Sequence, residues 1–305
     1  MSSQPLNLVE RAAERLRQSG SLDGGTAQLL GGEPAIHTLV PPAEAPPPPR
    51  GRAPGEEAAT ARPSPIPISV MERAGMIDWS KGRSRVSEEF RIIQGQIMRA
   101  AFAPQVTGQG LANLVMVTSA RPGEGKSFAA LNLALSIARQ RDHAVLLVDT
   151  DAKDQSVGRT LGLIDRPGLL DLALDPRLDP DAVIATTGFE KLSVLPLGSD
   201  PAKSAELFAT RQMARLVRDL GRRYADRIVI LDAAPCLSSS DPSTLAPIVG
   251  QIVLVIEAER TQRSEVEAAL DLVQACPSIS LLLNKVQVDT SYTFGAYASP
   301  YYTAS

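Results

Sequence analysis

The sequence predicts an α/β domain in which a mostly parallel sheet is flanked by helices on both faces. From residue 111 onward, short runs that are apolar throughout alternate with longer helical stretches. This alternation is typical of a parallel sheet, whose buried strands are apolar on both faces. The composition agrees, because 44% of the 305 residues are hydrophobic and 21% are charged, which is ordinary for a globular chain.

The individual elements follow from the length and periodicity of each run. The predicted strands are Leu114–Val117, Val145–Val148, Leu192–Leu195, Ile228–Leu231, Ile252–Ile256 and Leu281–Leu283. The predicted helices are Ser127–Arg139, Ser204–Arg223 and Ser264–Gln274. A further helix is predicted over Ser87–Ala101, where apolar residues share one face: Phe90, Ile93, Ile97 and Ala101.

Four parts are predicted along the chain. Residues 1–19 contain a short amphipathic helix, either a docking helix for a partner or a solvated helix that is marginal in isolation. Residues 20–68 are predicted to be a disordered linker, because ten of the 24 prolines lie between Pro41 and Pro67. Residues 69–288 form the folded domain. Residues 289–305 form a flexible tail.

Several classes of protein are excluded at this stage. No run of 18 apolar residues predicts a membrane-spanning helix, and the amino terminus lacks the apolar core of a signal peptide. Two cysteines, Cys236 and Cys276, fit a reducing compartment. The net charge of -3 argues against a nucleic-acid partner. We therefore expect a cytoplasmic protein without direct membrane insertion, which can reach a membrane only through a partner.

A phosphate-binding loop is predicted between the strand at 114–117 and the helix at 127–139. The segment TSARPGEGKS, residues 118–127, has the strand–loop–helix order of a P-loop. Gly123 and Gly125 let the backbone approach a phosphate, and the amino terminus of the following helix points its N–H groups at the anion. Lys126 is expected to reach the β- and γ-phosphates, and the Ser127 hydroxyl to ligate Mg²⁺.

Acidic residues follow two of the predicted strands. Asp149 and Asp151 come after Val145–Val148, and Asp232 comes after Ile228–Leu231. Because the carboxyl ends of parallel strands line the ligand crevice, these carboxylates are expected to point into the site. One would hold the metal and another would polarise an attacking hydroxyl, but the sequence does not decide whether Asp149 or Asp151 is the base. Helix capping or a turn is the alternative role.

Two polar features lie near the end of the chain. Asn284 closes the last predicted strand, where its amide suits the adenine edge; a plain strand-end turn is the alternative. Four of the five tyrosines fall in the last 14 residues, in a polar stretch without an amphipathic face: Tyr292, Tyr297, Tyr301 and Tyr302. A substrate arm explains this placement better than an ordinary disordered terminus.

These residues resemble a known family. TSARPGEGKS, VLLVDTDAK and IVILDAAP are similar to the three Walker-type motifs of bacterial tyrosine autokinases, a deviant P-loop branch that also holds the MinD and ParA ATPases. The resemblance covers roughly residues 85–305. The amino-terminal LVERAAERLRQ, the Pro-rich linker and SEEFRIIQ resemble the exosortase-associated subgroup, which consists of cytoplasmic autokinases encoded with exopolysaccharide export machinery.

The resemblance implies a protein-tyrosine kinase that uses ATP and Mg²⁺ to phosphorylate its own tail, each tail entering a neighbour's site in a ring of subunits. Lys126, Asp149, Asp151 and Asp232 are then catalytic, and Ser127, Asp149 and Asp232 hold the metal. Nucleotide contacts would come from Arg121, Pro122, Gly123, Glu124, Gly125, Lys126, Ser127, Phe128 and Asn284. A membrane polysaccharide co-polymerase (a chain-length determinant) is implied as activator, with a tyrosine phosphatase as a further partner.

The resemblance also assigns Glu88 and Arg91 to the start of an oligomerisation motif, in which Gln94 stands where a second basic residue is usual. Two other functions use the same site. One is a MinD/ParA-like ATPase switch, which needs no tyrosine tail. The other is a non-catalytic regulator of polysaccharide export.

Overall fold

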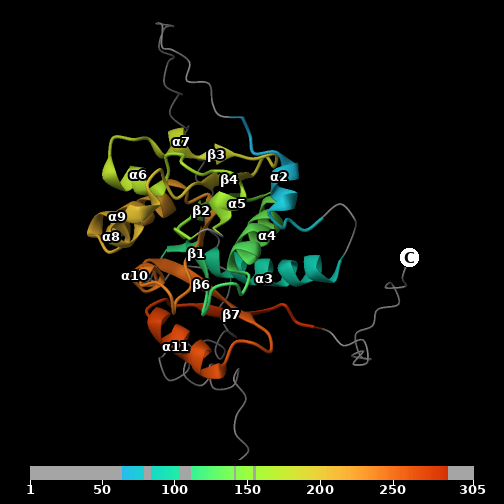
Figure 1. The fold of residues 1–305 in the computed structure, drawn as a ribbon. Coiled ribbons are helices and arrows are strands. Elements are labelled where there is room, and N and C mark those ends of the chain that lie inside the picture. The colour runs from blue at the N-terminus through green and yellow to red at the C-terminus, as the bar shows by residue number, and fades with distance from the viewer. Residues whose placement is uncertain (1–63, 79–83, 103–110, 141, 154–155, 288–305) are drawn as a thin grey trace, which may run out of the picture. The chain divides into compact units, whose positions relative to one another are not determined.

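A seven-stranded sheet organises the residues that the structure describes (Figure 1). The computed structural model describes residues 64–78, 84–102, 111–140, 142–153 and 156–287. The strand order is β3-β4-β2-β5-β1-β6-β7. The strands are β1 Leu111–Ser119, β2 Ala144–Asp149, β3 Ala185–Thr186, β4 Leu192–Leu195, β5 Arg227–Asp232, β6 Val249–Glu257 and β7 Ile279–Asn284.

Parallel pairing joins every neighbouring pair of strands except β3 and β4. All six predicted strands are confirmed; β4 has the predicted bounds, and the other five extend one to three residues further at each end. The sequence did not predict β3, which is only two residues long and runs antiparallel to β4. The register of β2 on β5 places Asp149 directly beside Asp232. The two acids predicted to follow separate strands are therefore neighbours.

Helices cover both faces of the sheet, with α2, α3 and α4 on one side and α8 to α11 on the other (Figure 1). The helices are α2 Ile68–Arg73, α3 Arg85–Ala101, α4 Lys126–Ala138, α5 Val157–Thr160, α6 Leu169–Leu174, α7 Pro180–Val183, α8 Ser204–Phe208, α9 Arg211–Arg223, α10 Asp241–Leu245 and α11 Arg263–Val273, with a 3₁₀ turn at Pro201–Lys203. The helices predicted at 87–101, 127–139 and 264–274 are confirmed as α3, α4 and α11.

The helix predicted over Ser204–Arg223 is wrong as a single element. It is two helices, α8 and α9, which are separated by Thr210 in an extended conformation. The Thr210 hydroxyl accepts a hydrogen bond from the Met213 N–H at 3.1 Å and so caps α9. A threonine at this position satisfies one of the N–H groups that a helix start leaves unpaired, which favours a new start over a continuous helix.

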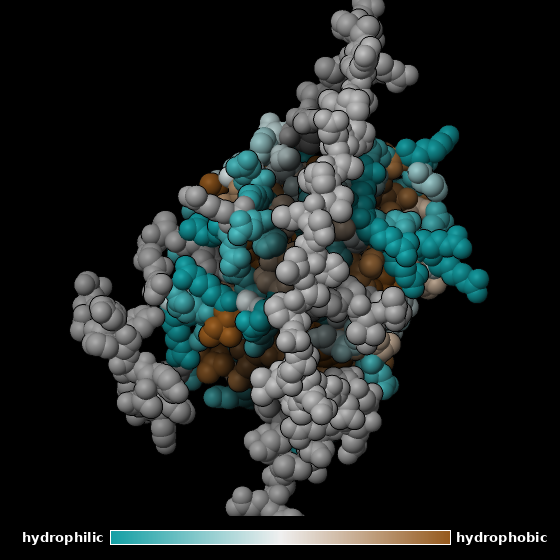
Figure 2. All heavy atoms as spheres, turned by 180° about the vertical axis from the view of Figure 1, so that it is seen from behind, coloured by the Kyte–Doolittle hydropathy of each residue, from teal (hydrophilic) through white to brown (hydrophobic). Residues whose placement is uncertain are grey.

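One hydrophobic core cluster lies between the sheet and the helices α3 and α4. Phe90, Ile97 and Ala101 of α3 are buried, as their spacing predicts, and Ile93 packs against the same cluster. Helix α4 is buried almost all round, because it lies under α3 and over β1, β2 and β5. In the view from behind, hydrophobic residues appear at the surface between hydrophilic ones, with a larger brown area at the lower left (Figure 2).

Pairing of Ile66 marks the start of the described fold. Its N–H donates to the Thr186 carbonyl and its own carbonyl accepts from the Gly188 N–H, both at 2.9 Å. The side chain of Ile66 is buried, so contacts with the sheet begin three residues before the predicted domain boundary at residue 69. The predicted amino-terminal helix, residues 20–63 of the predicted linker and the predicted tail lie outside the described residues.

None of the helices that the structure describes is both long enough and apolar enough to cross a membrane.

Candidate functional site

The loop from Ala120 to Gly125 joins β1 to α4. Gly123 and Gly125 have φ angles of 86° and 93°, in the left-handed region that only glycine enters without strain. A Cβ on Gly125 would also lie 2.2 Å from the Asn284 side-chain nitrogen. Helix α4 begins at Lys126 without a side-chain cap, so its amino terminus is available to an anion. These are the conformations that a phosphate-binding loop needs.

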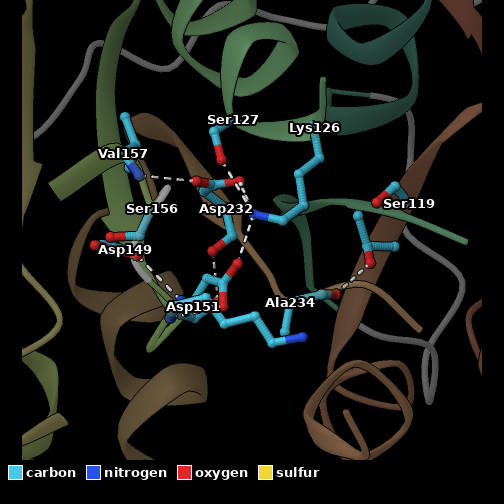
Figure 3. Close-up of polar contacts among 12 residues, drawn as sticks. Ser119, Lys126, Ser127, Asp149, Asp151, Ser156, Val157, Asp232 and Ala234 are labelled. Atoms are coloured by element: carbon cyan, nitrogen blue, oxygen red, sulfur yellow. Dashed lines mark hydrogen bonds and ion pairs between the residues drawn. The ribbon is translucent and has the colours of Figure 1, made fainter. Parts of the chain in front are cut away.

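Lys126 lies at the floor of the site and points toward acids from two strands (Figure 3). Its Nζ is 2.7 Å from Asp151 Oδ2 and 3.5 Å from Asp232 Oδ1. It also donates to Ser127 Oγ at 3.0 Å. The side chain is only 10% exposed. The predicted catalytic lysine, hydroxyl and carboxylates are thus brought together in one buried cluster.

Backbone N–H groups hold the carboxylates in place (Figure 3). The two oxygens of Asp149 accept from the N–H groups of Asp151 and Gly158, each at 3.0 Å. Asp232 accepts from Val157 N–H at 3.3 Å. The carboxylates are fixed by main chain around them, which limits their motion when a ligand binds.

The charges in this cluster shift one another's pKa. Burial raises the pKa of Asp149 to about 7, and the neighbouring Asp232 adds to the shift. Burial also raises the pKa of Asp232, although Lys126 opposes it. For Lys126, burial alone would lower the pKa, but the carboxylates of Asp232 and Asp151 outweigh it and hold the pKa above its usual range. The lysine therefore stays charged at neutral pH.

A pocket of about 460 Å³ opens above the cluster. Seven of the predicted site residues line this pocket: Pro122, Gly123, Gly125, Lys126, Ser127, Phe128 and Asp151. Sequence reasoning missed four other lining residues: Ala74, Lys153, Thr160 and Pro235. Lys153 and Pro235 are the last residues of the motifs VLLVDTDAK and IVILDAAP, so their position was a usable signal. Ala74 and Thr160 carry no such signal, because only folding brings α2 and α5 to the loop.

Arg121 and Glu124 face a second pocket, of about 370 Å³, together with Glu257 and Lys285. The Glu124 carboxylate accepts from the Arg121 N–H at 2.7 Å and also contacts the Thr261 hydroxyl. Arg121 is half-exposed and lies 3.4 Å from a Glu265 oxygen. Neither of these two predicted nucleotide contacts lines the 460 Å³ pocket, so their contact with nucleotide stays a prediction.

Asn284 braces the loop from the end of β7. Its Nδ2 donates to the Glu124 carbonyl at 2.8 Å, and Lys285 Nζ donates to the Gly123 carbonyl at 2.7 Å. Asn284 is not among the residues that line the 460 Å³ pocket. Its observed contact is therefore with the backbone of the phosphate loop, and a contact with adenine stays a prediction.

The residues predicted for oligomerisation lie on α3, away from the phosphate loop. Arg91 Nη1 and Glu88 Oε1 form an ion pair at 3.0 Å on the outer face of that helix. Gln94, in contrast, is buried and its Oε1 accepts from Ser136 Oγ at 2.6 Å. The residue at the third motif position therefore faces α4.

The four tail tyrosines lie outside the described residues. The fifth, Tyr224, is only 4% exposed. Its hydroxyl donates to Asp181, and the Arg227 guanidinium lies 4.9 Å from the ring centroid. Burial and the Asp181 contact raise the pKa of Tyr224 to about 12. A buried, neutral and bonded hydroxyl is poorly placed to accept a phosphoryl group.

The parallel sheet, the glycine loop before α4 and the acids that end β2 and β5 define a P-loop nucleotide-binding protein. No model of a known protein family matches the chain. The tyrosine-protein kinase YwqD of Bacillus subtilis (strain 168) is 30% identical over 233 residues, which cover 76% of this chain and 94% of YwqD. The chain therefore belongs to the family of bacterial tyrosine-protein kinases, and it is an enzyme of that class.

Solved structures agree with this assignment. The crystal structure of the chimerical protein CapA2B2 matches with a TM-score of 0.57 and 29% identity, covering 70% of this chain and 91% of that one. The VpsO kinase domain matches with a TM-score of 0.53 and 28% identity, covering 67% of this chain and all of that one. The predicted fold and the predicted enzyme class are thereby confirmed.

Proposed function

We propose that the protein transfers the γ-phosphoryl group of ATP, with Mg²⁺, to tyrosines of its own carboxyl-terminal tail, one subunit acting on another. The observation that carries this proposal is the position of Lys126, which lies at the base of the phosphate-loop pocket within 2.7 Å of Asp151 and 3.5 Å of Asp232. This cluster combines a cation for the phosphates with carboxylates for a metal and a proton, the parts that phosphoryl transfer requires.

The proposed transfer uses the chain's own groups in named roles. Lys126 leaves Asp151 to reach the β- and γ-phosphates, which frees that carboxylate. Asp151 lines the pocket and Asp149 does not, so we assign the base to Asp151. The tyrosine oxygen attacks the γ-phosphorus while its proton passes to Asp151. The bond from that phosphorus to the β–γ bridging oxygen breaks, and ADP leaves with the bonding electrons.

Ser127, Asp149 and Asp232 are the proposed metal ligands. Their donor atoms are all oxygens, the type that Mg²⁺ prefers, and the Asp149 and Asp232 carboxylates are buried side by side. Within the described residues no group of three or more His, Cys, Asp or Glu side chains is arranged to hold a metal by itself. When bound, Mg²⁺ would neutralise charge on the nucleotide phosphates.

Labelled ATP tests the activity. We expect the full chain with Mg²⁺ to gain phosphotyrosine, and Lys126→Met to gain none. Lys203→Met is the matched control, since that lysine is half-exposed in an ion pair with Asp200 and lies outside the pocket. ATP hydrolysis without phosphotyrosine would instead support the MinD/ParA-like switch. Polysaccharide export that is normal in a Lys126→Met strain would support a non-catalytic regulator.

Mixing two variants tests transfer between subunits. A chain truncated after Asp289 keeps the proposed kinase site but lacks the four tail tyrosines. Lys126→Met keeps the tail but lacks the catalytic lysine. We expect label on the Lys126→Met chain when the two are mixed and on neither alone. Label that appears only on active full-length chains, and never in the mixture, would contradict transfer in trans.

The proposal extends to assembly and context. We propose a ring of subunits whose contacts use Glu88 and Arg91. Light scattering tests this ring, because the particle mass of Glu88→Ala should be lower than that of wild type. We also propose a membrane polysaccharide co-polymerase as activator, a tyrosine phosphatase as antagonist, and a cytoplasmic location at the membrane's inner face in exopolysaccharide production. We also propose the order of parts along the chain: a helix at 1–19, a linker at 20–68, the folded domain at 69–288 and a tail at 289–305.

A further inference from the structure

Helix α9 carries a stripe of exposed arginines. The stripe consists of Arg211, Arg215, Arg218 and Arg222. Their spacing of four, three and four residues places them on one face of the helix, over a length of about 16 Å. The buried side chains of α9 lie on the opposite face: Met213, Val217 and Leu220. The arginine stripe is therefore the part of α9 that faces away from the fold.

The arginine stripe lies apart from the phosphate loop. Helices α6, α8 and α9 contact one another and form the left edge of the described fold (Figure 1). Helices α2, α3 and α4 cover the other side of the sheet (Figure 1). No residue of α9 lines the 460 Å³ pocket above the phosphate loop. The stripe is thus a surface that the proposed transfer of phosphate does not use.

Acidic groups neutralise little of the arginine stripe. Arg222 lies 3.5 Å from Asp219, and about two thirds of each of these side chains is exposed. No ion pair joins the other three arginines to any residue that the structure describes. On α3, in contrast, the exposed Arg85 has a glutamate partner, Glu89, at 2.8 Å. The positive charge of the stripe is therefore open to solvent.

Such a stripe works against the stability of α9. Like charges four residues apart repel each other on a helix, and the stripe contains two such pairs, Arg211 with Arg215 and Arg218 with Arg222. Arg211 is also the first residue of α9, where the helix dipole disfavours a cation. Surfaces that mix both signs of charge avoid this repulsion. An anionic partner would turn the repulsion into attraction.

A lipid surface complements the arginine stripe in shape and in charge. A bilayer is flat over this distance, so four guanidinium groups on one straight helix face can reach lipid phosphates together. Basic clusters of this size on a helix are typical of contacts with anionic lipids. Leu174, which is 53% exposed, lies beside the start of α9, because the carbonyl of Ala173 accepts from Gln212 Nε2. An apolar side chain suits the boundary of the acyl chains, whereas the phosphate backbone of a nucleic acid offers it no apolar surface.

We propose that the arginine stripe of α9 binds the surface of a membrane whose lipids carry net negative charge. The guanidinium groups donate hydrogen bonds to lipid phosphates, and Leu174 lies at the boundary between headgroups and acyl chains. The contact is peripheral, and no helix crosses the membrane. It is a direct attachment, in addition to the one expected through a partner, and it does not depend on kinase activity.

Co-sedimentation of the full chain with vesicles tests the proposal. One set of vesicles contains about 40% phosphatidylserine in phosphatidylcholine, and the other contains phosphatidylcholine alone. We expect binding to the anionic vesicles at about 0.1 M NaCl and a marked loss at about 0.5 M, because salt screens the attraction. We expect no binding to the neutral vesicles at either salt concentration.

A double variant locates the binding on α9. Arg215→Gln combined with Arg218→Gln removes two charges from the middle of the stripe. Each basic residue at an anionic surface raises the partition coefficient about fivefold, so this variant should bind about 25-fold more weakly. Arg73→Gln combined with Arg99→Gln is the matched control, because it changes the net charge equally at exposed positions on α2 and α3. Thermal unfolding followed by circular dichroism checks that both double variants are folded.

Four results would overturn the proposal. The first is no binding to anionic vesicles at the lower salt concentration. The second is equal binding to neutral vesicles, which would exclude a role for charge. The third is an equal loss of binding in both double variants, which would assign the effect to net charge instead of to the stripe. The fourth is a random DNA duplex that binds more tightly than the vesicles and displaces them, which would make the stripe a nucleic-acid surface.

Discussion

Replacing Lys126 by Met should destabilise the nucleotide-free protein. The change removes the cation that lies 2.7 Å from Asp151 and 3.5 Å from Asp232, while all three side chains are at least 90% buried. Breaking a buried ion pair by removing one partner costs about 3–5 kcal/mol, because the remaining charge is left uncompensated. We expect a loss of that size in the free energy of unfolding at pH 8.

The loss should shrink at pH 5. Burial has already raised the pKa of Asp149 to about 7 and that of Asp232 above its usual range, so these acids take up protons as the pH falls. A protonated acid no longer needs the lysine. Removing the cation raises these pKa values further, which increases the difference between the two pH values.

Urea unfolding at pH 5 and pH 8, with EDTA and without nucleotide, measures both effects. Lys203→Met is the control, since its exposed ion pair with Asp200 is worth about 0–1 kcal/mol at either pH. A Lys126→Met protein as stable as wild type at pH 8, with an unchanged denaturant slope, would refute the reasoning. A loss that is larger at pH 5 than at pH 8 would refute it equally.

Three further predictions concern single features of the structure. Gly125→Ala should abolish nucleotide binding, because the new Cβ would lie 2.2 Å from Asn284 Nδ2. In Gly123→Ala the new Cβ meets nothing within 4 Å, so the free energy of unfolding, measured by thermal unfolding, should fall by only about 1–2 kcal/mol. Gln94→Met should change the free energy of unfolding by less than about 1 kcal/mol, because removal of the unpaired amide nitrogen is offset by loss of the acceptor for the buried Ser136 hydroxyl. A loss of about 3 kcal/mol in urea unfolding would contradict this cancellation. The free energy of unfolding of wild type in EDTA should fall as the pH rises from 4 to 7, by up to roughly 4 kcal/mol from Asp149. The reason is that the pKa of Asp149 is about 7 in the folded protein and 3.8 ordinarily, so the native state holds a proton that the unfolded state has lost. A free energy of unfolding that rises across that window would contradict the prediction.

The parts of the fold that the sequence predicted are those with strong local signals. Buried parallel strands such as β1 and β6 are apolar on both faces, so they can be recognised without knowing their neighbours. The phosphate loop is a contiguous segment, and its glycines mark the positive φ angles seen at Gly123 and Gly125. Short elements such as β3 and α5 are too brief to show a period, so the sequence did not reveal them.

Other features depend on contacts between distant segments. The contact of the Glu124 carboxylate with Thr261 joins residues that lie 137 positions apart in sequence, and the contact of Glu124 with nucleotide stays a prediction. Asn284 and the Glu124 carbonyl are separated by 160 residues. The burial of Gln94, in contrast, had a local signal. It follows Phe90 by four positions and precedes Ile97 by three, which places it on the apolar face of α3.

The brace from β7 to the phosphate loop determines where the chain can be shortened without changing the enzyme. Asn284 and Lys285 hold the carbonyls of Glu124 and Gly123, so the last strand is a structural part of the nucleotide site. A deletion that removes the tyrosines together with Lys285 would loosen the loop, and lost labelling would then report a damaged kinase. A cut after Asp289 preserves both contacts. Only such a cut separates the absence of a substrate from the absence of a catalyst.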